Sequence, residues 1–302
     1  MTQVQIKRLH SLTGHRDAVY ALQGSAENSH FFSASGDGMV VRWNLQDPEA
    51  GELIARLTNS VYALHYLPKD DTLIAGHNYE GVHVLDWKNK KELGSLKLTT
   101  AAVFDIQSLG DRILVAAGDG SVSLVDWKSL TVLKRAQPSA KSARTIAVDS
   151  SQGEIAVGFS DNYIRVFDDK LALKHEWLAH EKSVFTLKYS PGGGMLLSGS
   201  RDARLKAWDV RARYEKAEEV VAHMYAINDI EFSPDGKHFV TCSMDKSIKV
   251  WDAGALRLLK VIDKARHAGH GTSVNKLLWT NFDNQLLSAS DDRSISVWQI
   301  IF

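Results

Sequence analysis

The feature that most constrains this chain is a segment that recurs every 40 to 47 residues. Four stretches align without a gap: SASGDGMVVRWN (33–44), SGSRDARLKAWD (198–209), TCSMDKSIKVWD (241–252) and SASDDRSISVWQ (288–299). Three weaker copies lie between them: AGHNYEGVHVLD (75–86), VAAGDGSVSLVD (115–126) and VGFSDNYIRVFD (157–168). The seven copies, numbered 1 to 7, end at residues 44, 86, 126, 168, 209, 252 and 299. A repeat this short cannot bury its hydrophobic face alone, so the copies must pack on one another.

Each repeat is predicted to form four short strands. In the fifth, VFTLKY is an alternating strand, SPGGG a turn, MLLSGS a second strand and RLKAWDV a third, and AEEVVA follows as a fourth. Similar turn chemistry recurs between the first two strands of other repeats, as in SPDG and NFDN. The predicted protein is therefore all-β.

The period and the Trp-Asp endings resemble the WD40 repeat family over essentially the full length of the chain. This resemblance implies a single domain, residues 1–302, folded as a seven-bladed β-propeller of four-stranded antiparallel blades. The seventh repeat ends just after its third strand. We expect residues 4–12, VQIKRLHSL, to complete blade 7 and close the ring, which removes an open sheet edge.

Repeats 1, 5, 6 and 7 share a polar set in which histidine precedes aspartate by 22 residues and tryptophan follows it by 6. The sets are His15, Asp37 and Trp43; His180, Asp202 and Trp208; His223, Asp245 and Trp251; and His270, Asp292 and Trp298. A hydrolase needs one nucleophile in one pocket, so four copies indicate a structural role. The resemblance implies a buried chain from indole N–H through a hydroxyl and the imidazole to the carboxylate. Hydroxyls occur both four and two residues before each aspartate, and spacing does not choose between them.

The weaker repeats lose this set as a whole. The histidine positions hold Leu57, Lys97 and Ser139, and the tryptophan positions hold Leu85, Val125 and Phe167. Joint loss is expected of a cooperative buried network, because a half-satisfied network is worse than an apolar one. The remaining turn aspartates, Asp119 and Asp161, are expected to bond their own backbone.

The candidate binding surface is the channel rim on the face that carries the histidine loops, here called the top face. The residues that follow the first apolar position of each first strand are expected there: Tyr20, Tyr62, Phe104, Thr145, Phe185, Asn228 and Asn275. Residues before the turn aspartates, including Arg201, Met244 and Asp291, are expected on the same face. The aromatic residues either pack between blades or anchor a partner. The resemblance favours a peptide segment bound at this rim.

Charge and cysteine content restrict the partner and the compartment. Thirty-six basic residues balance 36 acidic ones, which disfavours nucleic acid and anionic membranes as partners. The basic cluster Lys264, Arg266 and His267 is interpreted as a solvated loop, or as a contact for an acidic partner. No apolar run approaches a membrane span and no secretory signal is seen, so we expect a cytoplasmic protein with one buried thiol, Cys242.

No catalytic residue, cofactor or metal is predicted. HNYEGVH (77–83) suggests zinc, but its two histidines fall before a strand turn and within a third strand, and clustering with carboxylates is not evident from spacing. The predicted function is a scaffold or adaptor that binds a protein or peptide at the top rim, as a monomeric subunit of a larger complex. The alternatives are a metal-assisted hydrolase that uses channel carboxylates such as Asp105 and Asp229, and a nucleic-acid binding module.

Overall fold

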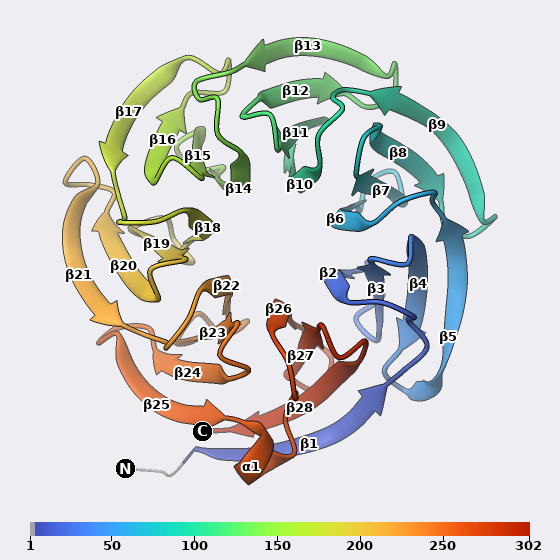
Figure 1. The fold of residues 1–302 in the computed structure, drawn as a ribbon, viewed down its shortest axis with the longest axis vertical. Coiled ribbons are helices and arrows are strands. Elements are labelled where there is room, and N and C mark those ends of the chain that lie inside the picture. Colours follow the sequence, from blue (N-terminus) through green and yellow to red (C-terminus); the bar gives the residue numbers. More distant parts are fainter. Residues whose placement is uncertain (1–3) are drawn as a thin grey trace.

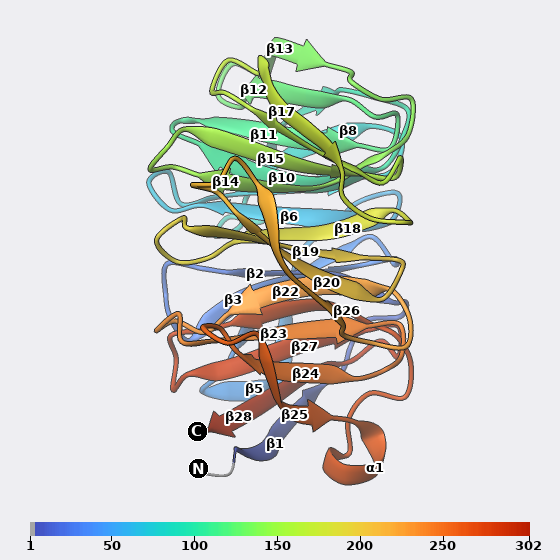
Figure 2. The same cartoon turned by 90° about the vertical axis from the view of Figure 1, so that its left-hand side faces the viewer.

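The computed structural model describes residues 4–302 and contains seven four-stranded antiparallel sheets arranged around a central axis (Figure 1). Each sheet is one blade, and its strands follow chain order from the channel outward in blades 1 to 6. The described residues form a single short helix, α1 (Lys264–His267), which projects from the loop that leads into blade 7 (Figure 2). The predicted fold class, a closed seven-bladed propeller, is confirmed.

Four strand positions recur in every blade. The first strands line the channel: β2 (Val19–Gly24), β6 (Val61–Leu67), β10 (Val103–Leu109), β14 (Ala143–Asp149), β18 (Val184–Tyr189), β22 (Ile227–Phe232) and β26 (Val274–Trp279). The second strands are β3 (His30–Ser35), β7 (Thr72–His77), β11 (Arg112–Ala117), β15 (Glu154–Phe159), β19 (Met195–Ser200), β23 (His238–Ser243) and β27 (Gln285–Ser290).

The outer half of each blade carries the repeat ending and a more exposed strand. The third strands are β4 (Met39–Asn44), β8 (Gly81–Asp86), β12 (Val122–Asp126), β16 (Tyr163–Phe167), β20 (Arg204–Asp209), β24 (Ile248–Asp252) and β28 (Ile295–Ile301). The outer strands are β5 (Asp47–Arg56), β9 (Lys91–Lys97), β13 (Thr131–Ala136), β17 (Leu173–Leu178), β21 (Glu215–Val221), β25 (Arg257–Ile262) and β1 (Gln5–Leu12).

The N-terminal strand closes the ring. β1 pairs antiparallel with β28 from Gln5 opposite Ile301 to Leu12 opposite Ile295, so the two ends of the chain meet in blade 7 (Figure 1). Val4 and Leu12 are buried beside this pairing. The last blade therefore has a paired outer strand in place of an open edge, which confirms the predicted closure.

The hydrophobic core consists of seven clusters, each shared by two neighbouring blades. Second strands are buried along most of their length because a blade packs on each face, and β7, for example, is buried at every position. Outer strands alternate or are largely exposed, as in β13. The blades thus form a ring whose exposed surfaces are its two faces, where the channel opens, and its outer edge.

Every first strand contains a register shift directly after its first paired residue. The residues skipped by the pairing are Tyr20, Tyr62, Phe104, Arg144, Phe185, Asn228 and Asn275. A β-bulge leaves one residue unpaired and redirects its side chain. The fold therefore presents one bulged residue per blade at the top of the channel.

Candidate functional site

The four polar sets form equivalent buried chains in blades 1, 5, 6 and 7. The indole N–H lies 2.8 to 3.0 Å from the hydroxyl oxygen, and this oxygen lies 2.7 to 2.9 Å from the imidazole Nε2. The imidazole Nδ1 lies 2.9 to 3.2 Å from the aspartate. The hydroxyls that join the chains lie four residues before the aspartates: Ser33, Ser198, Thr241 and Ser288. The geometry thus resolves the choice that spacing left open.

The second set of hydroxyls, two residues before the aspartates, has a different role. The Ser35, Ser200 and Ser243 hydroxyls donate to backbone carbonyls of the top-face loops at 3.0 to 3.2 Å. The network hydroxyls are fully buried, and each already accepts from an indole and contacts an imidazole. A buried hydroxyl saturated in this way has no face open to a substrate, so these sets are unsuitable as nucleophiles.

The direction of each chain follows from the indole, which can only donate. In blade 5, Trp208 donates to Ser198, Ser198 donates to the Nε2 atom of His180, and the Nδ1–H group donates to Asp202. Burial lowers the pKa of His180, which keeps the imidazole neutral. Burial acts to raise the pKa of Asp202, but hydrogen bonds from His180 and two backbone N–H groups outweigh it and hold the pKa at about 2.

Blades 3 and 4, which lack the network histidine but keep the turn aspartate, pair that aspartate with an arginine. Asp119 accepts hydrogen bonds from the backbone N–H of Ser121, as expected, and also pairs with Arg135 at 2.6 Å. Asp161 accepts from its own turn backbone and pairs with Arg165 at 2.9 Å. Sequence reasoning missed both arginines, because they lie on different strands of the blade and share no spacing. The donor that the imidazole provides elsewhere is therefore supplied by the Arg135 guanidinium and the Thr99 hydroxyl in blade 3, and by Arg165 in blade 4.

The bulged residues of blades 1 to 5 form a continuous arc of side chains in contact with one another around the channel mouth. The ring centroids of Tyr20 and Tyr62 are 4.8 Å apart, and those of Tyr62 and Phe104 are 5.8 Å apart. The Arg144 guanidinium lies 4.1 Å from the Phe104 ring centroid and 4.6 Å from that of Phe185. These side chains are half-buried and line a channel of about 510 Å³. We name this set the aromatic arc.

Arg144, and not Thr145, occupies the arc in blade 4, so the prediction of Thr145 at the rim is wrong. Ala143 pairs with Phe159 and Thr145 with Gly158, so the bulge skips Arg144. Thr145 is buried and accepts a hydrogen bond from the Leu187 N–H of the next blade. No ion pair among the described residues includes Arg144, and burial lowers its pKa. The arc thus contains a cation stacked between two rings, without a carboxylate partner.

The two asparagines on the opposite side of the mouth connect blades. The Asn228 amide donates to Ser273 at 3.0 Å and to the Val274 carbonyl at 2.8 Å. The Asn275 amide donates to the Val19 carbonyl at 3.1 Å and to Asp291 at 2.7 Å. Their donors are therefore already used between blades 6, 7 and 1.

The top face of blade 6 carries an exposed apolar patch. Arg201 and Met244 lie at the top face as expected, and Met244 is 51% exposed. Beside Met244, the loop after His223 presents Met224 and Tyr225, which are 81% and 61% exposed. Sequence reasoning missed these two residues. The signal was two apolar residues directly after a network histidine, where the other three loops carry polar or glycine residues.

The channel carboxylates also join neighbouring blades. Asp105 accepts from the Ile146 N–H at 2.7 Å, and burial raises its pKa. Asp229 accepts from the Leu277 N–H at 3.0 Å and pairs with Lys276 at 3.1 Å. Neither belongs to a cluster of metal-ligating side chains among residues 4–302. Hydrogen bonding between neighbouring blades accounts for the positions of these two carboxylates, and no catalytic role is needed to explain them.

The enlarged loop before blade 7 contains the short helix α1, whose N-terminus is capped by Asp263. Asp263 accepts from the Arg266 N–H at 2.8 Å and forms an ion pair with its guanidinium at 2.6 Å. Lys264 and Arg266 are exposed. Of the predicted basic cluster, the charge of Arg266 is thus neutralised by Asp263.

Comparison with known families matches the four blades that carry the buried network. The family model described as "WD domain, G-beta repeat" matches residues 6–44, 172–209, 216–252 and 263–299, which together make up half of the chain. The chain belongs to the WD40 family. The matched stretches of this WD40 protein each contain a histidine, an aspartate and a tryptophan of one buried chain.

Relatives and solved structures agree with this assignment. The WD40 chain is 22% identical over 223 residues to "Guanine nucleotide-binding protein subunit beta" of Zea mays, which covers 68% of this chain and 59% of that protein. It is 25% identical over 222 residues to "Striatin-4" of Homo sapiens, covering 70% of this chain and 25% of that protein. The alignments thus span less than two thirds of these curated relatives.

The "WD40 beta propeller domain of Doa1" superposes with a TM-score of 0.87 at 16% identity, covering 98% of this chain and 97% of that chain. At this identity the likeness shows the fold alone. In the described part of this WD40 chain, no helix combines the length and apolar character that crossing a bilayer demands.

The buried histidines predict that this WD40 protein loses stability in mild acid. A histidine whose pKa falls on folding stabilises the protein above pH 6.5, and this contribution is lost as the pH decreases toward the folded pKa. Burial lowers the pKa of His65 to about 4, and also lowers the pKa values of His15, His180 and His223. The free energy of unfolding, measured with urea, is expected to fall between pH 6.5 and 4. The variant His65→Gln should lose about 3 kcal/mol less over this interval. An equal loss in the variant and the wild type would contradict the role of His65.

Proposed function

We propose that this WD40 protein is a non-catalytic interaction module that binds a segment of a partner protein at the top face. The observation that carries the proposal is the aromatic arc, in which bulges in five consecutive first strands present contacting side chains at the channel mouth. The rings contact one another, so part of their surface serves blade packing. The remaining surface lines the channel, and such aromatic anchors at a rigid concave site are typical of binding hot spots.

Arg144 narrows the chemistry of the bound segment. Its guanidinium is stacked between two rings and has no ionic partner among the described residues. We therefore propose that the partner segment places a carboxylate, from an acidic side chain or a chain terminus, against Arg144. Apolar side chains of the partner then pack on the arc and on the patch of Met224, Tyr225 and Met244.

The proposal extends to assembly and location. The maize relative is named as a subunit, which supports a role for this chain within an assembly, and we propose that it enters that assembly as a monomer. Its single cysteine, Cys242, is fully buried, and burial raises the pKa of its thiol, so the fold needs no disulfide. We propose a cytoplasmic location, where thiols stay reduced.

Affinity capture with matched variants tests the binding surface. The double variant Tyr62→Ala, Phe104→Ala and the single variant Arg144→Ala are expected to lose the partner, because removal of a hot-spot side chain weakens binding by at least about tenfold. A control double variant, Val132→Ala and Leu133→Ala, removes exposed apolar side chains from outer strand β13 and should retain it. All variants are first compared by thermal melting.

Identical captured proteins from all four forms would overturn the top-face proposal. Loss of binding after nuclease treatment, with strong dependence on salt, would favour a nucleic-acid partner. Stabilisation by calcium at the channel carboxylates would favour the propeller-enzyme alternative. Only a partner lost from the arc variants and kept by the β13 variant supports the proposal.

A further inference from the structure

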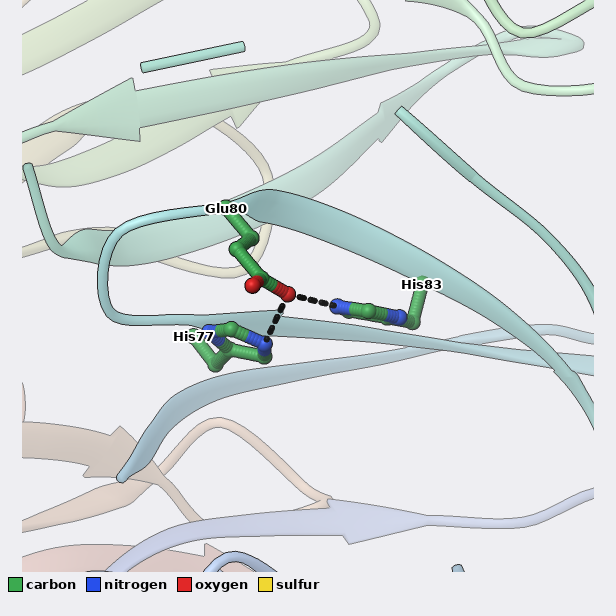
Figure 3. A group of neighbouring side chains, drawn as sticks. All are labelled: His77, Glu80 and His83. Atoms are coloured by element: carbon green, nitrogen blue, oxygen red, sulfur yellow. Dashed lines mark ion pairs between the residues drawn. The ribbon is translucent and has the colours of Figure 1, made fainter. Parts of the chain in front are cut away.

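The turn between β7 and β8 in blade 2 brings together two histidines and a glutamate, although their spacing gave no evident cluster. His77, Glu80 and His83 each offer one ligand atom, and these atoms all lie within 4.8 Å of one another (Figure 3). The Nε2 atom of His77 is 3.4 Å from Oε2 of Glu80, and that of His83 is 4.0 Å from the same oxygen. The three residues form the one such group among residues 4–302.

The hydrogen bonds of the two imidazoles define their tautomers. Nδ1 of His77 contacts the Asn78 carbonyl, and Nδ1 of His83 lies 3.0 Å from a Glu92 carboxylate oxygen. Both partners are acceptors, so each Nδ1 carries a hydrogen and each neutral ring has its lone pair on Nε2. Both Nε2 atoms are buried and lack a hydrogen-bond partner. Two lone pairs and a carboxylate thus face one another without a donor, which is costly unless a cation lies between them.

The architecture of the blade does not account for this arrangement. In the repeat alignment His77 takes the position of Ser35, and His83 takes that of Val41. Ser35 donates to a loop carbonyl in blade 1, whereas His77 contacts its neighbour Asn78 and the Glu80 carboxylate and stacks on the His83 ring, with the ring centroids 4.6 Å apart. Blade 2 also holds Tyr79 at the position of the turn aspartate. Neither imidazole therefore replaces a member of the buried network.

We propose that His77, His83 and Glu80 bind a Zn²⁺ ion through the two Nε2 atoms and Oε2. Zinc takes nitrogen and oxygen ligands at about 2.0 to 2.2 Å, so ligand atoms of a tetrahedral site lie about 3.4 Å apart. The His77 to Glu80 distance matches this value, and a small rotation of half-exposed Glu80 shortens the distance to His83. The exposure of Glu80 leaves the fourth position to water.

The surrounding groups match those that support metal-bound histidines. A ligating histidine usually donates its other N–H to a carboxylate or a backbone carbonyl, which orients the ring and raises its basicity. Glu92 and the Asn78 carbonyl occupy these positions. Asn78 also donates to the Tyr62 hydroxyl at 3.4 Å, so the site adjoins the aromatic arc.

Zinc titration of the untagged, chelator-treated protein tests the proposal, with a chromophoric chelator as competitor. The wild type is expected to bind one Zn²⁺ per chain with micromolar or tighter affinity. Glu80→Gln and His83→Gln should weaken binding at least about tenfold, and Glu92→Gln should weaken it about 10- to 100-fold as a supporting residue. The control His10→Gln alters an exposed histidine on β1 and should bind as the wild type does.

Each variant is also melted in the presence of chelator, so that a folding defect is distinguished from a lost ligand. Co²⁺ in place of zinc provides a second readout, because a tetrahedral site gives intense visible absorption that an octahedral ion in solution lacks. Absence of binding at 100 µM Zn²⁺, which is about the affinity of an adventitious surface site, would overturn the proposal. Equal affinity in the wild type, Glu80→Gln and His83→Gln would overturn it as well.

Discussion

Deletion of residues 1–12 is expected to abolish the single cooperative unfolding transition of this protein. The deletion removes β1, leaves the outer edge of β28 unpaired while its other edge still pairs with β27, and uncovers the apolar clusters that contain Val4 and Leu12. Each buried aliphatic side chain contributes about 1.5 to 3 kcal/mol, so the two side chains and the strand pairing together exceed about 4 kcal/mol. Thermal melting by circular dichroism should show a broad, early transition, and size exclusion should show aggregates that form through the open edge.

A variant within β1 distinguishes the loss of ring closure from a general sensitivity of this strand to substitution. Lys7→Ala together with His10→Ala changes two exposed side chains and keeps β1 in place. This variant should melt within about 0.5 kcal/mol of the wild type. If the deletion protein melted as sharply and at the same temperature as this control, the pairing of β1 with β28 would not be needed to hold the ring closed.

His180→Ala is expected to cost about 3 kcal/mol of unfolding free energy. The substitution leaves the buried Asp202 carboxylate without its imidazole donor and the Ser198 hydroxyl without its acceptor. Removal of one partner from a buried charged hydrogen bond leaves the other uncompensated in a medium of low dielectric constant. Urea denaturation at pH 7.5 measures the loss of unfolding free energy. An unchanged m-value would show that the variant and the wild type expose the same amount of surface on unfolding.

Lys97 offers a control for this substitution, because it precedes Asp119 by the same 22 residues as His180 precedes Asp202. In the structure Lys97 is an exposed residue of β9, and the Thr99 hydroxyl donates to Asp119 instead, so Lys97→Ala should change stability by less than about 0.5 kcal/mol. Asp202→Asn combined with His180→Ala should cost less than the sum of the single changes, because the two groups act through one bond. Additive costs, or a loss in His180→Ala no larger than that of Lys97→Ala, would show that the network does not stabilise the blade.

The fold and the buried network could be predicted from the sequence because both rest on spacings that repeat. A histidine 22 residues before an aspartate occupies the same loop in each blade, so four copies identify the network without coordinates. The arc was predicted only in part. Tyr20, Tyr62, Phe104 and Phe185 line the channel mouth, whereas Thr145 was expected where Arg144 lies, since a bulge cannot be located from one strand alone.

By itself the sequence determined the number of blades, the strand that closes the ring and the histidine, aspartate and tryptophan of the four buried chains, while the structure selected their hydroxyls. These features follow from local periodicity and from the need to pair every edge and every buried polar group. Only the tertiary structure decided which side chains share a surface. The stacking of Arg144 between rings from two other blades, the arginine partners of Asp119 and Asp161, and the convergence of His77, Glu80 and His83 all depend on bulges and turns. Distances between strands and blades set these contacts, and spacing along the chain does not record them.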